Sequence, residues 1–167
     1  MDRRITAFPP VAPPGARVLV LGSMPSVESL NQGFYYAHPR NAFWHIVAEA
    51  FGAPFPETIP GRVALLEANG VALWDVLESC ERQGSLDSAI REPAVNDFAG
   101  LFERCPGIKR ILFNGGTANR LFLKHAAKWL EGREWQVMPS TSPAYTLSYE
   151  RKLALWRQAL RYEHESL

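Results

Sequence analysis

The chain has 167 residues, of which 47% are apolar and 21% are charged. This length suits one domain of ordinary size, and this composition suits a globular protein with a sizeable core. Together they exclude a wholly disordered chain, a collagen-like polymer and a small disulfide-stapled scaffold. Eighteen Lys and Arg against seventeen Asp and Glu leave a net charge of +1. A nucleic-acid-coating protein is therefore not expected, and any contact with nucleic acid needs a local patch.

The cysteines, the histidines and the hydropathy of the chain indicate whether it binds metal and where in the cell it acts. The two cysteines, Cys80 and Cys105, do not form a CxxC pair, and the four histidines have no metal-ligand spacing. We therefore expect no metal and no cofactor. Two lone cysteines are typical of a reduced, cytoplasmic protein. The sequence contains no signal-peptide pattern and no run of about 20 apolar residues, so we expect no membrane contact.

The first quarter of the chain combines an irregular lead-in, a strand and a long loop. Residues 1–16 are rich in proline and predict an extended lead-in packed on the surface. Residues 17–21 form a short run in which Arg17 is followed by four apolar residues, two of them β-branched, the pattern of a buried strand. Residues 22–41 show no helical periodicity, and an irregular stretch of this length indicates a functional loop. Apolar residues at helical spacing then predict a helix over 43–51, with Asn41 at the position of an N-cap.

The rest of the chain alternates between helices and strands. In order, the pattern predicts a helix over 62–68, a strand over 71–74, a polar turn-rich stretch over 80–95, a helix through 104 that is capped at 96–97, a strand over 110–113, a helix over 117–130, a strand over 135–138 and a helix from about 148. Such alternation indicates right-handed βαβ crossovers. We therefore expect one domain over residues 1–167, folded as a three-layer α/β/α sandwich with a four-stranded, mainly parallel sheet.

Small polar residues collect where the predicted strands end. In sheets of this kind the ligand site lies beyond the carboxyl ends of the strands. The residues found there are Gly22–Pro25, Asp75, Asn114–Gly116 and Ser140–Pro143. Phosphate-loop and nucleophile-elbow motifs are absent from the sequence. We therefore look for the chemistry at these four strand ends.

Each candidate at the strand ends has two interpretations. The aromatic run Phe34–Tyr36 suits a planar heterocycle, because rings stack on its faces, but it could simply cover the core. Asn41 could act in chemistry or only cap the following helix. Asp75 could accept an N–H from a bound base or cap a turn. The stretch Ser140–Pro143 could bind a phosphate or be an ordinary turn.

Three segments taken together resemble the uracil-DNA glycosylase superfamily, and most of all its hypoxanthine-DNA (deoxyinosine) glycosylase family. They are Gly22-Ser23-Met24-Pro25-Ser26, the stretch Tyr36–Trp44 (YAHPRNAFW) and Ser140-Thr141-Ser142-Pro143. The resemblance covers about residues 16–160. It implies a monofunctional, metal-free enzyme of base excision repair. This enzyme would hydrolyse the N-glycosidic bond of a deaminated base, hypoxanthine first, in double-stranded DNA, and would act as a monomer on a base flipped from the duplex.

The resemblance also assigns roles to seven residues. It implies catalysis by Asn41, base binding by Tyr36, Asp75 and Ser23, and DNA contact by Arg40, Ser140 and Ser142. Within these roles Tyr36 stacks on the flipped base and Asp75 accepts from its edge. Met24 stands where many members of the superfamily carry Asn or Asp. Two alternatives therefore remain, a mismatch-specific uracil/thymine glycosylase and a catalytically idle nucleic-acid-binding module of the same fold.

Overall fold

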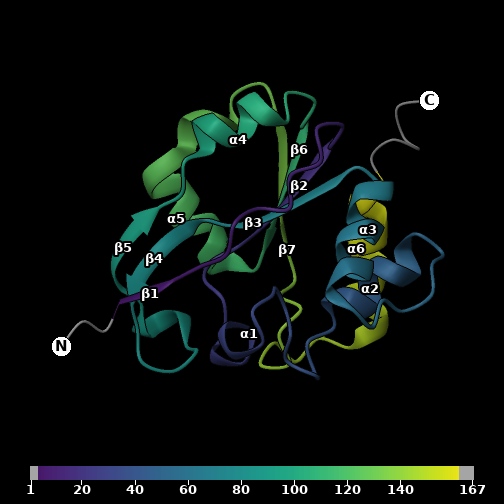
Figure 1. Ribbon diagram of the computed structural model, residues 1–167, viewed down its shortest axis with the longest axis horizontal. Helices are drawn as coiled ribbons and strands as arrows, with labels where there is room; N and C mark the ends of the chain where they lie inside the picture. Colours follow the sequence, from purple (N-terminus) through teal and green to yellow (C-terminus); the bar gives the residue numbers. More distant parts are fainter. Residues whose placement is uncertain (1–3, 162–167) are drawn as a thin grey trace.

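Four short runs of the chain form one parallel sheet in the computed structural model (Figure 1). The strands are β2 (Val18–Gly22), β3 (Val71–Asp75), β6 (Arg110–Asn114) and β7 (Glu134–Met138), side by side in the order β3-β2-β6-β7. Each neighbouring pair is parallel. Every residue of β2 and β3 is buried, as expected for strands covered on both faces. The predicted four-stranded parallel sheet is confirmed.

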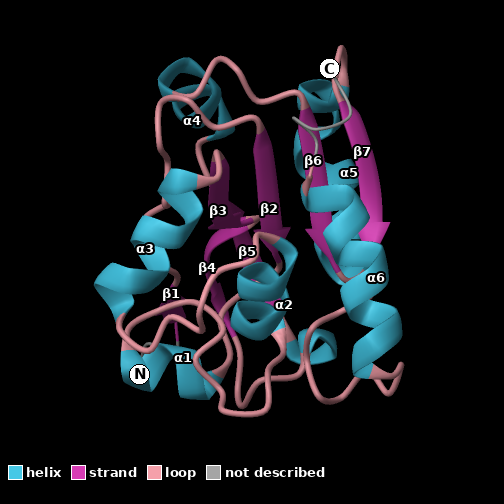
Figure 2. Ribbon diagram, turned by 90° about the vertical axis from the view of Figure 1, so that its right-hand side faces the viewer, coloured by secondary structure: helices cyan, strands magenta, loops and turns pink. Residues whose placement is uncertain are grey.

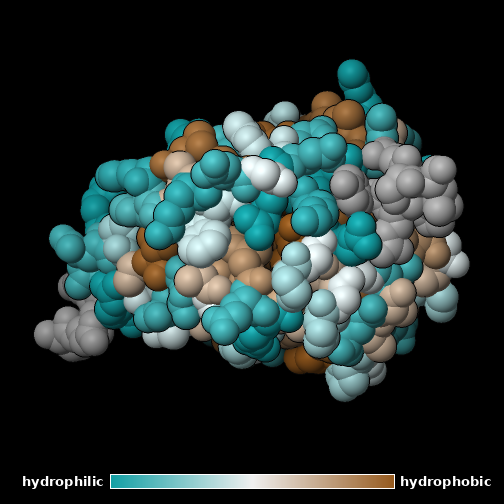
Figure 3. Space-filling view, turned by 90° about the horizontal axis from the view of Figure 1, so that it is seen from above, coloured by the Kyte–Doolittle hydropathy of each residue, from teal (hydrophilic) through white to brown (hydrophobic). Residues whose placement is uncertain are grey.

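The structure describes residues 4–161. Residues 1–3 of the predicted lead-in, and the last six residues of the predicted domain, lie outside this range. Within it no helix is long and apolar enough to cross a bilayer. The face seen in Figure 3 intersperses hydrophilic and apolar side chains.

Helices cover both faces of the parallel sheet, which confirms the predicted three layers. One group packs on the face that is turned toward the viewer in Figure 2, and the other group packs on the opposite face. The first group is α2 (Phe43–Ala50), α3 (Ile59–Ala68) and α6 (Tyr149–Leu160), and the second is α4 (Phe98–Arg104) and α5 (Gly116–Ala126). In Figure 2 the carboxyl ends of the strands point down, toward α1 (Val27–Gln32) and the long loops.

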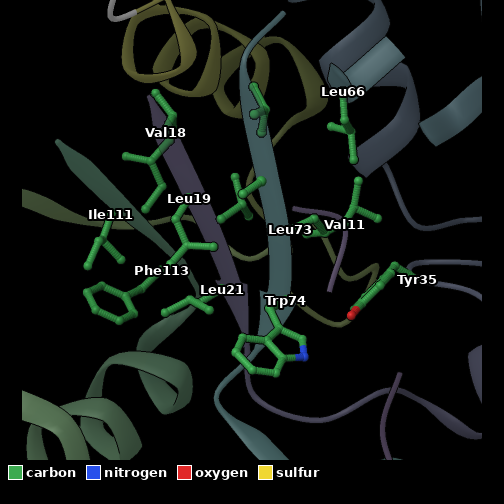
Figure 4. Close-up of a cluster of buried hydrophobic side chains, with 14 of the residues drawn as sticks. Val11, Val18, Leu19, Leu21, Tyr35, Leu66, Leu73, Trp74, Ile111 and Phe113 are labelled. Atoms are coloured by element: carbon green, nitrogen blue, oxygen red, sulfur yellow. The ribbon is translucent and has the colours of Figure 1, made fainter. Parts of the chain in front are cut away.

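The core lies between these layers and is built largely from the strands. Figure 4 shows Leu19 and Leu21 of β2 on one side of the sheet, and Leu66 of α3 near Leu73 of β3 on the other side. All four side chains are buried. Because the apolar strand residues hold the sheet between the helices, the strand ends are fixed in position relative to one another.

A second sheet was not predicted. The strands β1 (Arg4–Thr6), β4 (Leu77–Glu81) and β5 (Arg91–Val95) form an antiparallel sheet in the order β1-β4-β5. The prediction of only turns over 80–95 is therefore wrong in part. These strands are short and polar, and Pro93 lies inside one of them, so no apolar alternation reveals them. The prediction that the lead-in packs on the surface is also wrong in part, because Val11 and Ala16 are buried.

Two helix predictions also need correction. The 22–41 loop contains α1, whose six residues are too few to show an apolar stripe; Ser26 caps it and Gly33, at φ 79°, ends it. The helix predicted over 117–130 stops at Ala126 and continues as a 3₁₀ turn over Ala127–Leu130. Both differences concern local backbone geometry and leave the topology unchanged.

Candidate active site

A cavity of about 440 Å³ opens at the carboxyl ends of β2, β3 and β6. Six of the seven residues with predicted roles line it, and these are Ser23, Tyr36, Asn41, Asp75, Ser140 and Ser142. The seventh, Arg40, is exposed and does not line the cavity. Residues more than 100 positions apart in the sequence thus meet in one place, as the strand-end argument predicts.

One end of the cavity is shaped by the missing side chain of Gly22. Gly22 ends β2 and pairs in register with Asp75 at the end of β3. A Cβ atom on Gly22 would lie 2.5 Å from Asp75 Oδ1 and 2.9 Å from the Tyr36 hydroxyl oxygen. Only glycine therefore allows the Asp75 carboxyl and the Tyr36 hydroxyl to converge on the same point.

Asp75 is a buried carboxyl without a hydrogen-bond partner. Only 3% of the residue is exposed, and its Oδ2 is fully buried and unpaired within residues 4–161. Burial, and then the charge of Asp87, raise the pKa of Asp75 to about 7, although Arg82 opposes this shift. In the described part of the chain the carboxyl accepts no backbone N–H, so the turn-capping alternative is not what the structure shows. Near neutral pH the group is partly protonated and partly a carboxylate.

Tyr36 brings its hydroxyl to the same place through an unusual backbone. Its φ of 52° lies in the left-handed region, which costs a non-glycine residue roughly 1 kcal/mol. The ring packs against Phe43 with centroids 4.3 Å apart. The hydroxyl oxygen is buried and has no hydrogen-bond partner among the described residues. Burial, and then the charge of Asp75, raise the pKa of Tyr36, so the phenol keeps its proton.

Asn41 is not the N-cap of α2 that the sequence predicts, because Ala42 occupies that position. Its Oδ1 accepts a 2.9 Å hydrogen bond from Phe43 N–H at the start of α2. Within residues 4–161 its Nδ2 has no hydrogen-bond partner, and the side chain lines the cavity. The bond from Phe43 N–H therefore fixes the orientation of the amide and leaves the NH₂ group as a donor for a ligand.

The second sheet contributes a wall of the cavity that sequence reasoning missed. Asp87 lies in the 3₁₀ turn Asp87–Ala89 between β4 and β5, and its Oδ1 accepts a 2.8 Å hydrogen bond from Ser23 Oγ–H. Ser85, from the same connection, accepts from Val27 N–H at 2.8 Å. Both Asp87 and Ser85 line the cavity. In the sequence, Ser85 and Asp87 belong to a polar stretch that equally predicts a turn, so nothing marks them as part of a site.

The buried Arg82 ties this wall to the loop after β2. Its Nη2 donates to the carbonyl oxygen of Pro25, and its Nε donates to Gly84 O at 2.7 Å. Arg82 therefore joins the two chain segments that carry Ser23 and Asp87. The antiparallel sheet acts as a support for one side of the cavity.

The opposite wall is the stretch Ser140–Pro143, which Asn114 holds. The Asn114 side chain donates to Thr141 Oγ1 and accepts from Thr141 N–H, both at 3.0 Å. Ser140 Oγ accepts from Ser142 N–H, and Ser142 Oγ accepts from Ala144 N–H. These bonds form a turn, as one alternative proposed, yet they use only lone pairs of the two hydroxyls. The hydroxyl hydrogens remain for an anion.

Comparison with known proteins identifies the family. The model of the uracil DNA glycosylase superfamily matches residues 9–164. This chain belongs to that superfamily. It is 34% identical over 156 residues to the hypoxanthine DNA glycosylase of Methanosarcina acetivorans, covering 93% of this chain and 97% of the relative. The Methanosarcina barkeri protein of the same name is 30% identical over 155 residues, or 92% and 96% of the two chains.

A solved structure in the superfamily has the same fold. It is the solution NMR structure of a Methanosarcina acetivorans protein assigned to the uracil DNA glycosylases, and it matches with a TM-score of 0.82 and 33% identity. The match covers 95% of this chain and 98% of the other. The resemblance stated from the sequence motifs is thus confirmed.

Within this superfamily member, Met24 adds an apolar patch to the cavity. The residue is buried and lines the cavity next to Ser23. A thioether neither donates a strong hydrogen bond nor orients water. Within residues 4–161 no group of three or more His, Cys, Asp or Glu side chains could hold a metal ion. The polar side chains that line the cavity include the Asn41 amide, the Asp75 carboxyl and the His38 imidazole.

We predict that Gly22→Ala destabilises the protein by about 1–3 kcal/mol, because the added methyl group overpacks the space shared by Asp75 and Tyr36. Gly15→Ala is the matched control, since no atom lies within 4 Å of a Cβ at that position. Urea denaturation measures both. Equal midpoints for Gly22→Ala and the parent would show that the two side chains move aside freely.

The ionisation of Asp75 predicts a pH-dependent stability difference. Its pKa of about 7 in the folded protein lies above the ordinary 3.8, so the protonated carboxyl favours folding. This contribution is fully present below about pH 4 and is lost as the pH rises to about 7. The stability of Asp75→Asn relative to the parent should therefore increase between pH 4 and 7 and then level off. Urea denaturation at stepped pH tests this, and a constant difference would contradict it.

Proposed function

We propose that this chain is a DNA glycosylase that hydrolyses the N-glycosidic bond of a deaminated base, hypoxanthine first, in double-stranded DNA. The relatives named hypoxanthine DNA glycosylase support the reaction class. The observation that carries the choice of base is the buried, unpaired carboxyl of Asp75 at the end of the cavity. A buried polar group without a partner costs free energy that a ligand can recover.

The edge of a deaminated base complements this carboxyl. Hypoxanthine, xanthine and uracil each present a ring N–H beside a carbonyl group. The carboxylate of Asp75 accepts from the N–H, and the protonated carboxyl also donates to the carbonyl oxygen. Adenine presents a bare ring nitrogen at the corresponding position, which repels the ionised form of Asp75, the form that prevails above about pH 7. The Ser23 hydroxyl is nearby, but it already donates to Asp87, so it offers the base only an acceptor.

The loop over residues 33–42, which we call the aromatic loop, supplies a ring that stacks on the base. A flipped base leaves the duplex at a cost of a few kcal/mol, and stacking on an aromatic ring returns roughly 1–3 kcal/mol. Tyr36 is the stacking residue in this proposal. Its ring lies against Phe43, which supports it from one side. The cavity volume of about 440 Å³ leaves room for a purine ring system.

Asn41 is the catalytic residue in this proposal. Cleavage of the N-glycosidic bond develops positive charge on the sugar and negative charge on the departing base. A neutral amide is a poor general base, so positioning and electrostatic stabilisation must supply most of the acceleration. The Asn41 Nδ2 group, free of other partners in the described chain, is a donor for the charge that develops on the base. The bond from Phe43 N–H holds it in place before the reaction.

DNA contact falls to residues at the mouth of the cavity. The hydroxyls of Ser140 and Ser142 donate to phosphate oxygens, and the exposed Arg40 lies in the same aromatic loop as Tyr36. We further propose that the protein acts as a monomeric single domain, in line with the family match over residues 9–164. The free thiols of Cys80 and Cys105 are both buried, which supports action in the reducing cytoplasm.

The substrate is tested with duplexes that each carry one inosine, uracil or adenine at the same position. The purified protein is incubated with each duplex, and hot alkali then cuts the strand wherever a base has been removed. We expect cutting at inosine to exceed cutting at uracil, with none at adenine. Stronger cutting at mismatched uracil would instead favour a uracil/thymine glycosylase. Binding to inosine DNA without any cutting would identify an idle binding module.

Asn41 variants separate catalysis from the bond that Asn41 makes to the start of α2. If the residue acts through its amide, Asn41→Ala should lower single-turnover base release by about 10²–10³, the usual effect of losing one stabilising donor. DNA binding should persist. Asn41→Asp keeps an oxygen that accepts from Phe43 N–H, so its stability should stay near that of the parent while catalysis changes. Base release by Asn41→Ala within twofold of the parent would leave the bond from Phe43 N–H as its only role.

A further inference from the structure

The helix α6 holds the cavity wall from behind with two side chains on one of its faces. Lys152 and Trp156 are four residues apart, so they point the same way. Lys152 Nζ donates to Ser142 O at 3.1 Å, and Trp156 Nε1 donates to Pro139 O at 2.9 Å. Both residues are buried, Lys152 being only 4% exposed. The stretch 139–145, which we call the serine loop, is thus fastened to α6 at two backbone carbonyls.

The serine loop has further attachments on its other side. Ala42 N–H donates to Thr141 O at 3.0 Å, and Asn114 binds Thr141 through both ends of its amide. Ser142 O also accepts from Tyr145 N–H at 3.0 Å. The backbone conformation is therefore determined by neutral donors at most positions. Lys152 is the exception, because it brings a full charge to one carbonyl.

The hydrogen bond from Lys152 to the loop does not need a charged donor. Trp156 shows that an uncharged N–H donor on the same helix face can hold a loop carbonyl. Within residues 4–161 Lys152 has no ion pair with a carboxylate. Its ammonium group has only Ser142 O and the face of the Tyr145 ring, whose centroid lies 5.4 Å away. Burying a charge without a counter-charge is costly, and here burial lowers the pKa of Lys152.

An anion at the serine loop would supply the missing counter-charge. Ser140 and Ser142 use their oxygens as acceptors for loop amides, so both hydroxyl hydrogens are available to an anion. Lys152 lies directly behind the carbonyl of Ser142 and acts over this short distance through a poorly solvated interior. The net charge of the chain is only +1, so a local charge of this kind matters for binding to a polyanion.

We propose that Lys152 is a positioning residue that holds the serine loop in place and whose charge is neutralised by a DNA phosphate bound to the Ser140 and Ser142 hydroxyls. The proposal rests on the proposed function in one respect, that the polyanion is DNA. It gives α6 a part in DNA binding, although none of the seven residues with predicted roles lies on this helix. Because Lys152 is buried, it acts through the loop and does not itself reach into the duplex.

The test measures how salt affects binding to a duplex that carries 2′-fluoro-2′-deoxyinosine. The fluorine atom destabilises positive charge on the sugar, so the duplex binds without being cut. Each phosphate contact contributes about 0.9 to the slope of log Kd against log salt concentration. We expect Lys152→Met to lower this slope by about 1 and to weaken binding about tenfold near 0.15 M salt.

Lys128→Met is the matched control, because Lys128 is an exposed lysine in the 3₁₀ turn after α5, distant in the fold from the serine loop. Its salt slope should equal that of the parent. An unchanged slope for Lys152→Met, even with a lower melting temperature, would reduce Lys152 to a structural residue and overturn the proposal. If the parent does not bind the duplex at any salt concentration, both this proposal and the proposed function are wrong.

Two more variants separate charge from hydrogen bonding and still decide the matter if Lys152→Met does not fold. Lys152→Gln keeps an N–H donor but has no charge, whereas Lys152→Arg keeps the charge. We expect the Gln variant to lose about one unit of salt slope and the Arg variant to keep it. Equal slopes for the two variants would contradict a role for the charge. Binding without hypoxanthine release by the parent would refute the enzymatic function and leave the phosphate contact supported by the slopes.

Discussion

The absence of a side chain at Gly22 is the constraint on which the site depends. Gly22 and Asp75 end neighbouring parallel strands in register, so their side-chain positions compete for the same space. With only a hydrogen on Gly22, the Asp75 carboxyl and the Tyr36 hydroxyl share that space, and neither finds a hydrogen-bond partner in the described chain. The fold therefore holds two unsatisfied polar groups at the end of the cavity, an arrangement that favours a polar ligand.

The rest of the cavity is held by side chains that bind backbone carbonyls and amides. Arg82 fixes the loop after β2, and Asn114 fixes Thr141 in the serine loop. Lys152 and Trp156 fix the same loop from α6. The loops that carry the candidate chemistry thus have little freedom, although few of their residues belong to regular structure. Such preorganisation is what a reaction without a strong general base requires.

The sequence predicts the parallel sheet and the position of the site because both depend on strong local signals. Short apolar, β-branched runs such as 18–21 favour buried strands, and parallel strands bring their carboxyl ends together. The antiparallel sheet has no such signal, since its strands are short and polar. Asp87 was therefore missed, although it accepts from Ser23 and raises the pKa of Asp75. For Asn41 the sequence cannot tell which atom binds the start of α2, and the structure shows that Oδ1 accepts from Phe43 N–H.

A crystal structure of the protein bound to a duplex containing 2′-fluoro-2′-deoxyinosine tests the central claim most directly. The account predicts that hypoxanthine lies in the cavity outside the helical stack, with its N–H and carbonyl edge within 3.2 Å of the Asp75 carboxyl, a normal hydrogen-bond distance. The Asn41 amide should face the glycosidic bond. A hypoxanthine that remains stacked in the duplex, or that enters the cavity with this edge turned away from Asp75, would contradict the account.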